Sequence, residues 1–185
     1  PYTTLFRSNM AREYARYVPK SSGKYYGAYR VGDIMFIVLD CGEDKPDDFW
    51  VYAGLTDFDG YRTEQAAWFG ELIRSKAYKS AKWRIVMNHF PPLSHMESDN
   101  PERHGIQDIT DKFLPLYNQA KIDLMISGHT HAYEFMSPDK YDRLTFPVIV
   151  NSTESVARID IDGRTLKAKV TDTGGNTLKE FTISK

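Results

Sequence analysis

Cysteine is nearly absent from this sequence, which has one such residue, Cys41, among 185. A framework of internal disulfides is therefore excluded, although an oxidising compartment is not. The sequence also lacks any apolar run of the ~20 residues that a membrane-spanning helix needs, so a membrane is not an expected partner. Neither sign of charge predominates, because 24 basic residues face 25 acidic ones, and nothing indicates a nucleic-acid partner.

What is present is the composition of an ordinary globular domain. Hydrophobic residues make up 41% of the chain and charged residues 26%. A chain of 185 residues is long enough for one domain with a sizeable core. We find neither an internal repeat nor a low-complexity segment.

Helix-like and strand-like segments alternate in the first part of the chain. Strands are predicted at 24–30 and 33–39, the second almost wholly apolar and so expected to be buried on both faces. A helix capped by Thr63 follows, and a second helix is expected at 108–119, with its start made uncertain by a proline. The remaining predicted strands are 83–87, 122–127, 147–150, 156–161, 165–171 and 177–183, with turns at Asp162-Gly163 and Thr173–Asn176.

Histidines follow two of these predicted strands at their carboxyl ends. The strand 122–127 leads through a glycine into His129 and His131, and the strand 83–87 leads into His89. A glycine at the end of a strand lets the backbone turn, so that neighbouring side chains can converge. Imidazole is the commonest neutral metal ligand. The pattern therefore predicts a metal site at the edge of a sheet, although histidine pairs also occur on ordinary strands.

Two motifs carry a family resemblance. The sequence G-H-T-H-A-Y-E at 128–134, preceded by N-H-F-P-P at 88–92, resembles the calcineurin-like metallophosphoesterases, and most closely their purple-acid-phosphatase-like branch. The last motif of that branch ends in arginine, where this chain has Phe135. Segments 24–40 and 61–69 are also similar to the branch. The resemblance implies an α/β fold, of which this chain would be the C-terminal half of a four-layer α/β/β/α sandwich.

The first three motifs of the family are not found. It builds a two-metal site from D-x-H, G-D-x-x-D (or Y) and G-N-H-D/E, followed by a single histidine and G-H-x-H. No D-x-H occurs in this chain, and Gly32-Asp33 is not followed by a second acid. Asn88-His89 precedes Phe90 rather than an acid, so it fits the fourth motif better. We therefore expect residues 9–185 to be the C-terminal part of the domain, without its N-terminal half.

The first eight residues suggest how such a chain could arise. P-Y-T-T-L-F-R-S is the translation of CCC TAC ACG ACG CTC TTC CGA TCT, which matches the end of a widely used sequencing adapter. We expect residues 1–8 to be an adapter-derived scar. The alternative is an ordinary native segment.

By the same resemblance, His89 and His129 would hold one metal ion and His131 the other. The missing motifs would supply the bridging carboxylate. The sequence leaves the metals open among iron, manganese and zinc. His95 and His104 lie in the loop where related phosphatases place histidines that face the substrate, which makes them candidate catalytic residues. A positioned general acid there would protonate the leaving alkoxide. Both could also be polar loop residues.

The function implied by the resemblance is metal-dependent hydrolysis of a small-molecule phosphate monoester, by in-line attack of a metal-bridging hydroxide. A phosphodiesterase on the same scaffold is one alternative, and a non-enzymatic, β-rich domain with a single zinc ion is another. A scaffold that has lost catalysis is a third. We expect the chain as written to be inactive and poorly stable. The resemblance points to a secreted or periplasmic location, and the sequence does not specify the oligomeric state.

Overall fold

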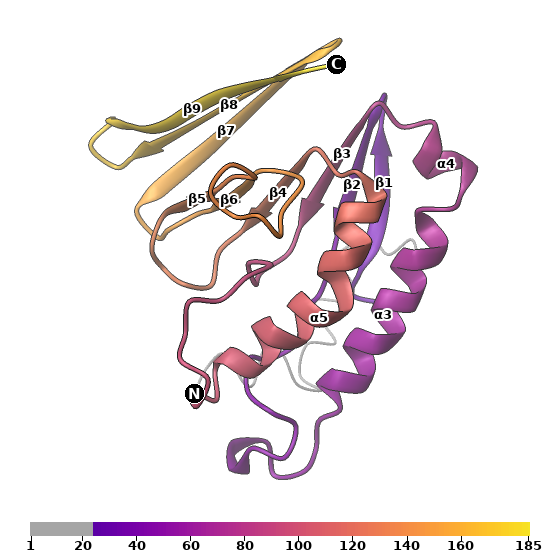
Figure 1. Cartoon of the computed structure of the whole chain (residues 1–185), viewed down its shortest axis with the longest axis vertical. Coiled ribbons are helices and arrows are strands. Elements are labelled where there is room, and N and C mark those ends of the chain that lie inside the picture. The colour runs from indigo at the N-terminus through magenta and orange to yellow at the C-terminus, as the bar shows by residue number, and fades with distance from the viewer. Residues whose placement is uncertain (1–23) are drawn as a thin grey trace.

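The computed structural model describes residues 24–185, so the predicted adapter-derived segment lies outside the described part. The described chain begins with a hairpin and continues through alternating helices and strands to a three-stranded meander (Figure 1). Its elements are β1 (Gly27–Val31), β2 (Ile34–Val38), the short 3-10 helix η2 (Trp50–Tyr52), α3 (Phe58–Leu72), α4 (Lys76–Lys79), β3 (Trp83–Met87), α5 (Arg103–Ala120), β4 (Leu124–Ser127), β5 (Glu134–Met136), β6 (Val148–Val150), β7 (Ser155–Asp162), β8 (Thr165–Asp172) and β9 (Thr177–Ser184).

The central layer is a six-stranded mixed sheet with the order β1-β2-β3-β4-β6-β5. Strands β2, β3, β4 and β6 are parallel, and the edge strands β1 and β5 run antiparallel to their neighbours. The carboxyl ends of the four parallel strands therefore meet at one edge of the sheet, where ligands gather in open α/β sheets.

Both faces of this sheet are covered. Helices α3 and α5 lie on one face, and the antiparallel sheet β7-β8-β9 lies on the other (Figure 1). Side chains alternate accordingly: Trp83 and Ile85 of β3 join the core between the two sheets, whereas Val86 joins the core under the helices. The predicted α/β fold class is confirmed, with helices, mixed sheet and antiparallel sheet as successive layers.

Helix α3 begins earlier than the sequence predicted, and the expected Thr63 cap is wrong. Two other carboxylates satisfy the first backbone N–H groups. Asp57 accepts from Gly60 N at 3.1 Å, and Asp47 accepts from Phe58 N at 2.7 Å and from Asp59 N at 3.0 Å. With the orphan donors satisfied there, the helix starts at Phe58, and Thr63 lies inside it.

Helix α5 also starts earlier than expected, at Arg103 rather than near residue 108, and it contains Pro115. Proline lacks one N–H donor, but burial of an apolar stripe including Ile109, Phe113 and Tyr117 holds the helix against the sheet. The expected loop before this helix is shorter as a result.

The two predicted turns of the meander are confirmed. Gly163 lies between β7 and β8 with φ +54°, and Gly175 between β8 and β9 with φ +82°. Both values fall in the left-handed region that glycine adopts without a steric penalty. No helix among residues 24–185 has the length and apolarity needed to cross a bilayer.

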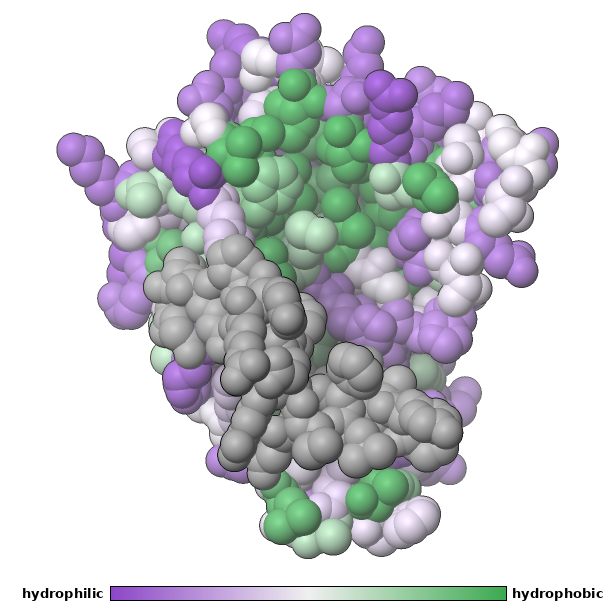
Figure 2. Space-filling model, turned by 180° about the vertical axis from the view of Figure 1, so that it is seen from behind, coloured by the Kyte–Doolittle hydropathy of each residue, from purple (hydrophilic) through white to green (hydrophobic). Residues whose placement is uncertain are grey.

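Apolar side chains also gather on one face of the molecule, seen from behind in Figure 2. Consistent with this, several side chains that pack against the core between the sheets are only partly buried. They include Ile34, Phe36, Ile126, Phe135 and Phe181.

Candidate metal centre and active site

His89 and His129 converge as the strand pattern predicted. They follow β3 and β4, which are parallel neighbours with Ile85 opposite Leu124. His129 Nδ1 lies 3.3 Å from His89 Nε2, and the ring centroids are 5.1 Å apart. His131 lines the same cavity as these two residues. The proximity is thus established, whereas the role of the three imidazoles as metal ligands stays a prediction.

The turn that carries the histidine pair has an unusual backbone. His129 has φ +73° and His131 has φ +58°, in the left-handed region that non-glycine residues seldom occupy. The backbone N–H of Gly128 donates to the carbonyl of His89 at 3.0 Å, which joins the two histidine-bearing loops directly. Local strain of this kind concentrates at functional sites, where the surrounding structure holds it in place.

A buried cluster beneath the site fixes the loop after β3. Cys41 Sγ donates to Asn88 Oδ1 at 2.6 Å, and Phe90 N donates to Cys41 Sγ at 3.2 Å. Burial raises the pKa of the Cys41 thiol to about 12, so the thiol stays protonated and acts as a donor. Cys41 is a packed structural residue, as the sequence suggested.

The cavity beside the histidines has a volume of about 780 Å³ and a mixed lining. Aromatic side chains of the loop after β2 form part of its wall, and the indole of Trp50 is 80% exposed. Charged side chains also line it, among them Glu43, Asp44, Lys45 and Glu102.

The side chains of this site are of a type that binds metal ions, but the described residues do not form a complete set of ligands. The donors that converge are imidazoles, which suit zinc and iron, whereas manganese prefers oxygen ligands. Within residues 24–185, however, no group of three or more His, Cys, Asp or Glu side chains is arranged to hold an ion. The described residues therefore offer imidazole donors without a bridging carboxylate.

His95 lies beside a second cavity of about 400 Å³, which shares Met96 and Thr130 with the first. Its Nε2 is 3.0 Å from Glu134 Oε1, and the ring is largely exposed. Tyr141 donates its hydroxyl proton to the same carboxylate, and this hydrogen bond raises the pKa of Tyr141 to about 12. Glu134 therefore orients His95 next to the histidine cavity.

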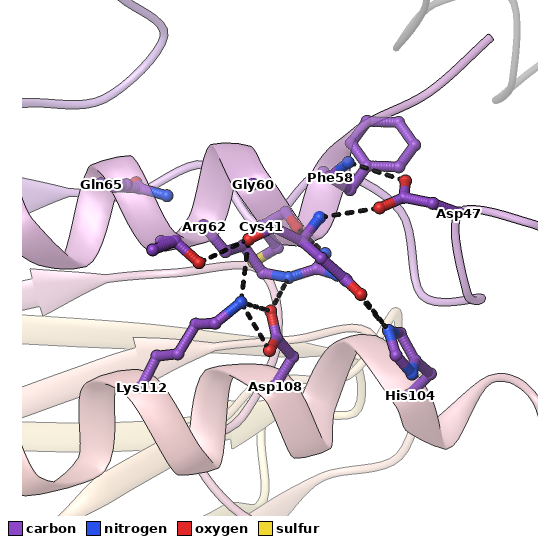
Figure 3. A network of polar contacts seen from close by, with 12 residues as sticks. Cys41, Asp47, Phe58, Gly60, Arg62, Gln65, His104, Asp108 and Lys112 are labelled. Atoms are coloured by element: carbon purple, nitrogen blue, oxygen red, sulfur yellow. Dashed lines mark hydrogen bonds and ion pairs between the residues drawn. The ribbon is translucent and has the colours of Figure 1, made fainter.

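The structure places His104 in different surroundings. Its Nε2 lies 2.9 Å from both carboxylate oxygens of Asp59, a residue of α3 (Figure 3). His104 is not among the described residues that line either cavity. This geometry favours a contact between α5 and α3 over a position facing the substrate, and the catalytic role of His104 stays a prediction.

Arg62 is the centre of the network that contains Asp59. Its guanidinium is fully buried and donates to Asp108 at 2.6 Å, to Asp59, and to the carbonyls of Cys41 at 2.7 Å and Glu43 at 3.0 Å (Figure 3). Arg62 thereby ties both helices to the loop after β2. Burial alone would raise the pKa of Asp59, but the hydrogen bond to His104 and the charge of Arg62 outweigh it and lower the pKa.

Sequence reasoning did not find three residues of this arrangement. Glu134 belongs to the G-H-T-H-A-Y-E motif, but the motif does not show that its side chain meets His95. Asp44 reads as one of several acids in a polar loop, and Arg62 as an ordinary polar position of a helix. Distinguishing them requires knowing which side chains the fold buries against one another.

A model of the calcineurin-like phosphoesterase family matches residues 6–133, more than half of the chain. The chain belongs to this family. Among the relatives it matches is the Arabidopsis thaliana protein named probable purple acid phosphatase 20, with 29% identity over 134 residues, covering 71% of this chain and 28% of that protein. An uncharacterized protein of Mycobacterium tuberculosis strain H37Rv is 32% identical over 122 residues, covering 65% of this chain and 22% of that protein.

A solved structure of the same branch confirms the fold of this family member. The purple acid phosphatase PPD1 from yellow lupin (Lupinus luteus) seeds matches with a TM-score of 0.58 at 15% identity, covering 91% of this chain and 34% of that chain. The resemblance to the purple-acid-phosphatase-like branch is therefore confirmed. The chain spans 28% of the length of the Arabidopsis relative and 22% of the mycobacterial one.

Proposed function

We propose that the protein carrying this chain hydrolyses small-molecule phosphate monoesters with the help of two metal ions. The observation that carries the proposal is the 3.3 Å contact between His129 Nδ1 and His89 Nε2 on the wall of a cavity that His131 also lines. Because the chain belongs to the phosphoesterase family, we interpret these histidines as metal ligands. We place the protein outside the cytoplasm, in the periplasm or secreted, by analogy with the same branch.

In this proposal His89 and His129 bind one ion and His131 the other. When bound, the pair of ions supplies charge stabilisation and an activated water. The described residues provide no group of three donors, so we propose that the remaining ligands lie outside residues 24–185. The protein's own side chains would orient the ester in the cavity, and His95, held by Glu134, would give a proton to the leaving oxygen.

The experiment is to recover and express the longer gene and to assay an aryl phosphate. We expect D-x-H, G-D-x-x-D/Y and G-N-H-D/E motifs upstream of Asn9, and turnover that requires iron, manganese or zinc and stops on chelation. Residues 1–185 alone should show no turnover above the free metal. An upstream segment without these motifs, or full activity of the short chain, would overturn the proposal.

The rival functions give different results in the same assay. A phosphodiesterase would prefer a bis-aryl phosphodiester over the monoester. A self-contained single-zinc domain would bind one zinc ion tightly within residues 1–185. The absence of any three-donor group among residues 24–185 argues against that domain.

The two candidate catalytic histidines, His95 in a loop and His104 in α5, give a further prediction. In the active, longer protein, we expect His95→Ala to lower kcat by about 10²-fold, the lower end of the range for a lost general acid. His104→Ala should change kcat less than about threefold, since exposed ion pairs contribute little, and its ring contacts Asp59. Steady-state kinetics with an alkyl phosphate, whose leaving group needs a proton, is the measurement. The reverse order of effects would assign the proton donor to His104.

A further inference from the structure

The two ring nitrogens of His129 face different partners. Nδ1 points to His89 at 3.3 Å, whereas Nε2 lies 3.8 Å from Asp44 Oδ2. The exposed fractions of the two side chains are only 14% for His129 and 15% for Asp44. Solvent therefore screens this contact much less than it would screen a contact on the open surface. A separation of 3.8 Å is too long for a closed hydrogen bond, so the Asp44 carboxylate acts on the ring through its charge.

Asp44 is held in place at several points. Its other oxygen, Oδ1, accepts from Lys45 Nζ at 2.9 Å, and its backbone carbonyl accepts from Gly105 N at 2.6 Å. Arg62 donates to the carbonyl of the preceding residue, Glu43, at 3.0 Å. Helices α3 and α5 thus both fix the segment that carries the carboxylate.

Gly105 shows how closely helix α5 approaches that segment. A Cβ atom at this position would lie 2.8 Å from the Cα of Asp44 and 2.8 Å from the carbonyl oxygen of Glu43. Backbone atoms cannot yield as the end of a flexible side chain can, so only glycine fits there. The close approach holds the backbone of Asp44 against the first turn of α5.

We propose that Asp44 is a positioning residue that selects the tautomer of His129. In a neutral imidazole one nitrogen carries a proton and the other a lone pair. A nearby anion favours the N–H dipole that points toward it, so the proton resides on Nε2 and the lone pair on Nδ1. Nδ1 is the atom that faces His89. Asp44 therefore directs the lone pair of His129 toward the space between its ring and the ring of His89.

The consequence for metal binding rests on the proposed function. A ligand imidazole commonly donates its second N–H to a carboxylate, which fixes the tautomer and the ring orientation, and loss of such a partner weakens metal affinity by about 10–100-fold. Asp44 lies on the Nε2 side of the His129 ring, where such a carboxylate would stand, at a distance of 3.8 Å.

The test uses residues 1–185 labelled with ¹⁵N-histidine, without metal, at a pH where the ring ¹⁵N shifts themselves show that His129 is neutral. Long-range ¹H–¹⁵N spectra distinguish the two tautomers of each ring. We expect His129 to carry its proton on Nε2, and Asp44→Asn to raise the Nδ1–H population relative to Nε2–H by about fivefold or more. Backbone amide spectra verify that each variant is folded.

Glu102→Gln is the matched control. It removes one negative charge from the same cavity, and the carboxylate of Glu102 contacts Lys45 Nζ at 3.3 Å rather than the ring of His129. The His129 tautomer should stay unchanged in this variant. His104, which contacts Asp59, serves as an internal reference in all three spectra. A wild-type His129 protonated on Nδ1, or an unchanged tautomer in Asp44→Asn, overturns the proposal.

A zinc titration of the same three proteins separates this inference from the proposed function. We expect the apparent zinc affinity to fall about 10-fold in Asp44→Asn and less than about twofold in Glu102→Gln. If the wild-type chain bound no zinc while the tautomer result held, the ligand assignment would fail and the role of Asp44 in selecting the tautomer would stand. If zinc bound equally well to the wild-type chain and to Asp44→Asn, and the tautomer did not change, the role of Asp44 would fail and the ligand assignment would stand.

Discussion

Removal of the His129 imidazole should nearly abolish the proposed phosphatase activity of the protein that carries this chain. We expect kcat/KM for an aryl phosphate to fall by about 10³-fold or more, because losing a metal ligand removes several kcal/mol of charge stabilisation and each 1.36 kcal/mol is a factor of ten. Two variants are needed. His129→Ala also forces alanine into a backbone with φ +73°, whereas His129→Gly removes the ring without that strain. Steady-state kinetics at saturating metal is the measurement.

Thr130→Ala provides the control for this experiment. Thr130 is the next residue of the same turn and lines the same cavity, but it carries no metal-binding ring. It should retain activity within about threefold, since its hydroxyl donates to the carbonyl of Ala132 at 3.1 Å and supplies no metal ligand. Equal losses of activity in Thr130→Ala and His129→Gly would show that activity depends on the conformation of the turn and not on the imidazole. Near-normal activity in both histidine variants would contradict the ligand assignment.

The second large effect is expected at Arg62, where stability rather than chemistry is affected. We expect Arg62→Ala to lower the free energy of unfolding by about 3–5 kcal/mol, the usual result of removing one partner of a buried ion pair. The guanidinium has no exposed surface and satisfies the carboxylate of Asp108 and two backbone carbonyls. Alanine leaves these acceptors without their donor. Urea unfolding monitored by circular dichroism measures the change.

Arg74→Ala is the matched control, because Arg74 also pairs with a carboxylate near α3 but is mostly exposed. Its loss should lower the free energy of unfolding by less than about 0.5 kcal/mol. Similar losses for Arg62→Ala and Arg74→Ala would contradict the central role of Arg62.

The network around Arg62 should also respond to acid. The pKa of Asp59 is lowered in the folded protein, so the stability it contributes is present above the ordinary carboxyl pKa and is lost as pH falls through the lowered value.

Local pattern was sufficient for the strands other than β5 and for two of the candidate ligands. The apolar run of β2 predicted a strand buried on both faces, and the histidine after β3 was expected to meet the pair after β4. That meeting follows from a general property of parallel neighbours, whose carboxyl ends share an edge. Both glycine turns of the meander were likewise predictable, because positive φ values favour glycine.

The helix starts could not be read from the sequence. Thr63 resembles a cap, yet Asp57 and Asp47 satisfy the first donors of α3. Asp47 comes from a loop and precedes the first residue of the helix by eleven positions, so its contribution depends on how that loop folds back. Burial of an apolar stripe likewise carries α5 through Pro115. In both cases contacts with the rest of the fold outweigh the local signal.

The sequence by itself determined the family, the α/β class and the identity of the three candidate metal-binding histidines, since these depend on short motifs and on periodicity. Only the tertiary structure decided how the other residues are used. It placed His95 against Glu134, His104 against Asp59, and Asp44 beside Nε2 of His129. Each of these pairs joins residues 39 to 85 positions apart, and no local pattern records which distant side chains a folded chain brings into contact.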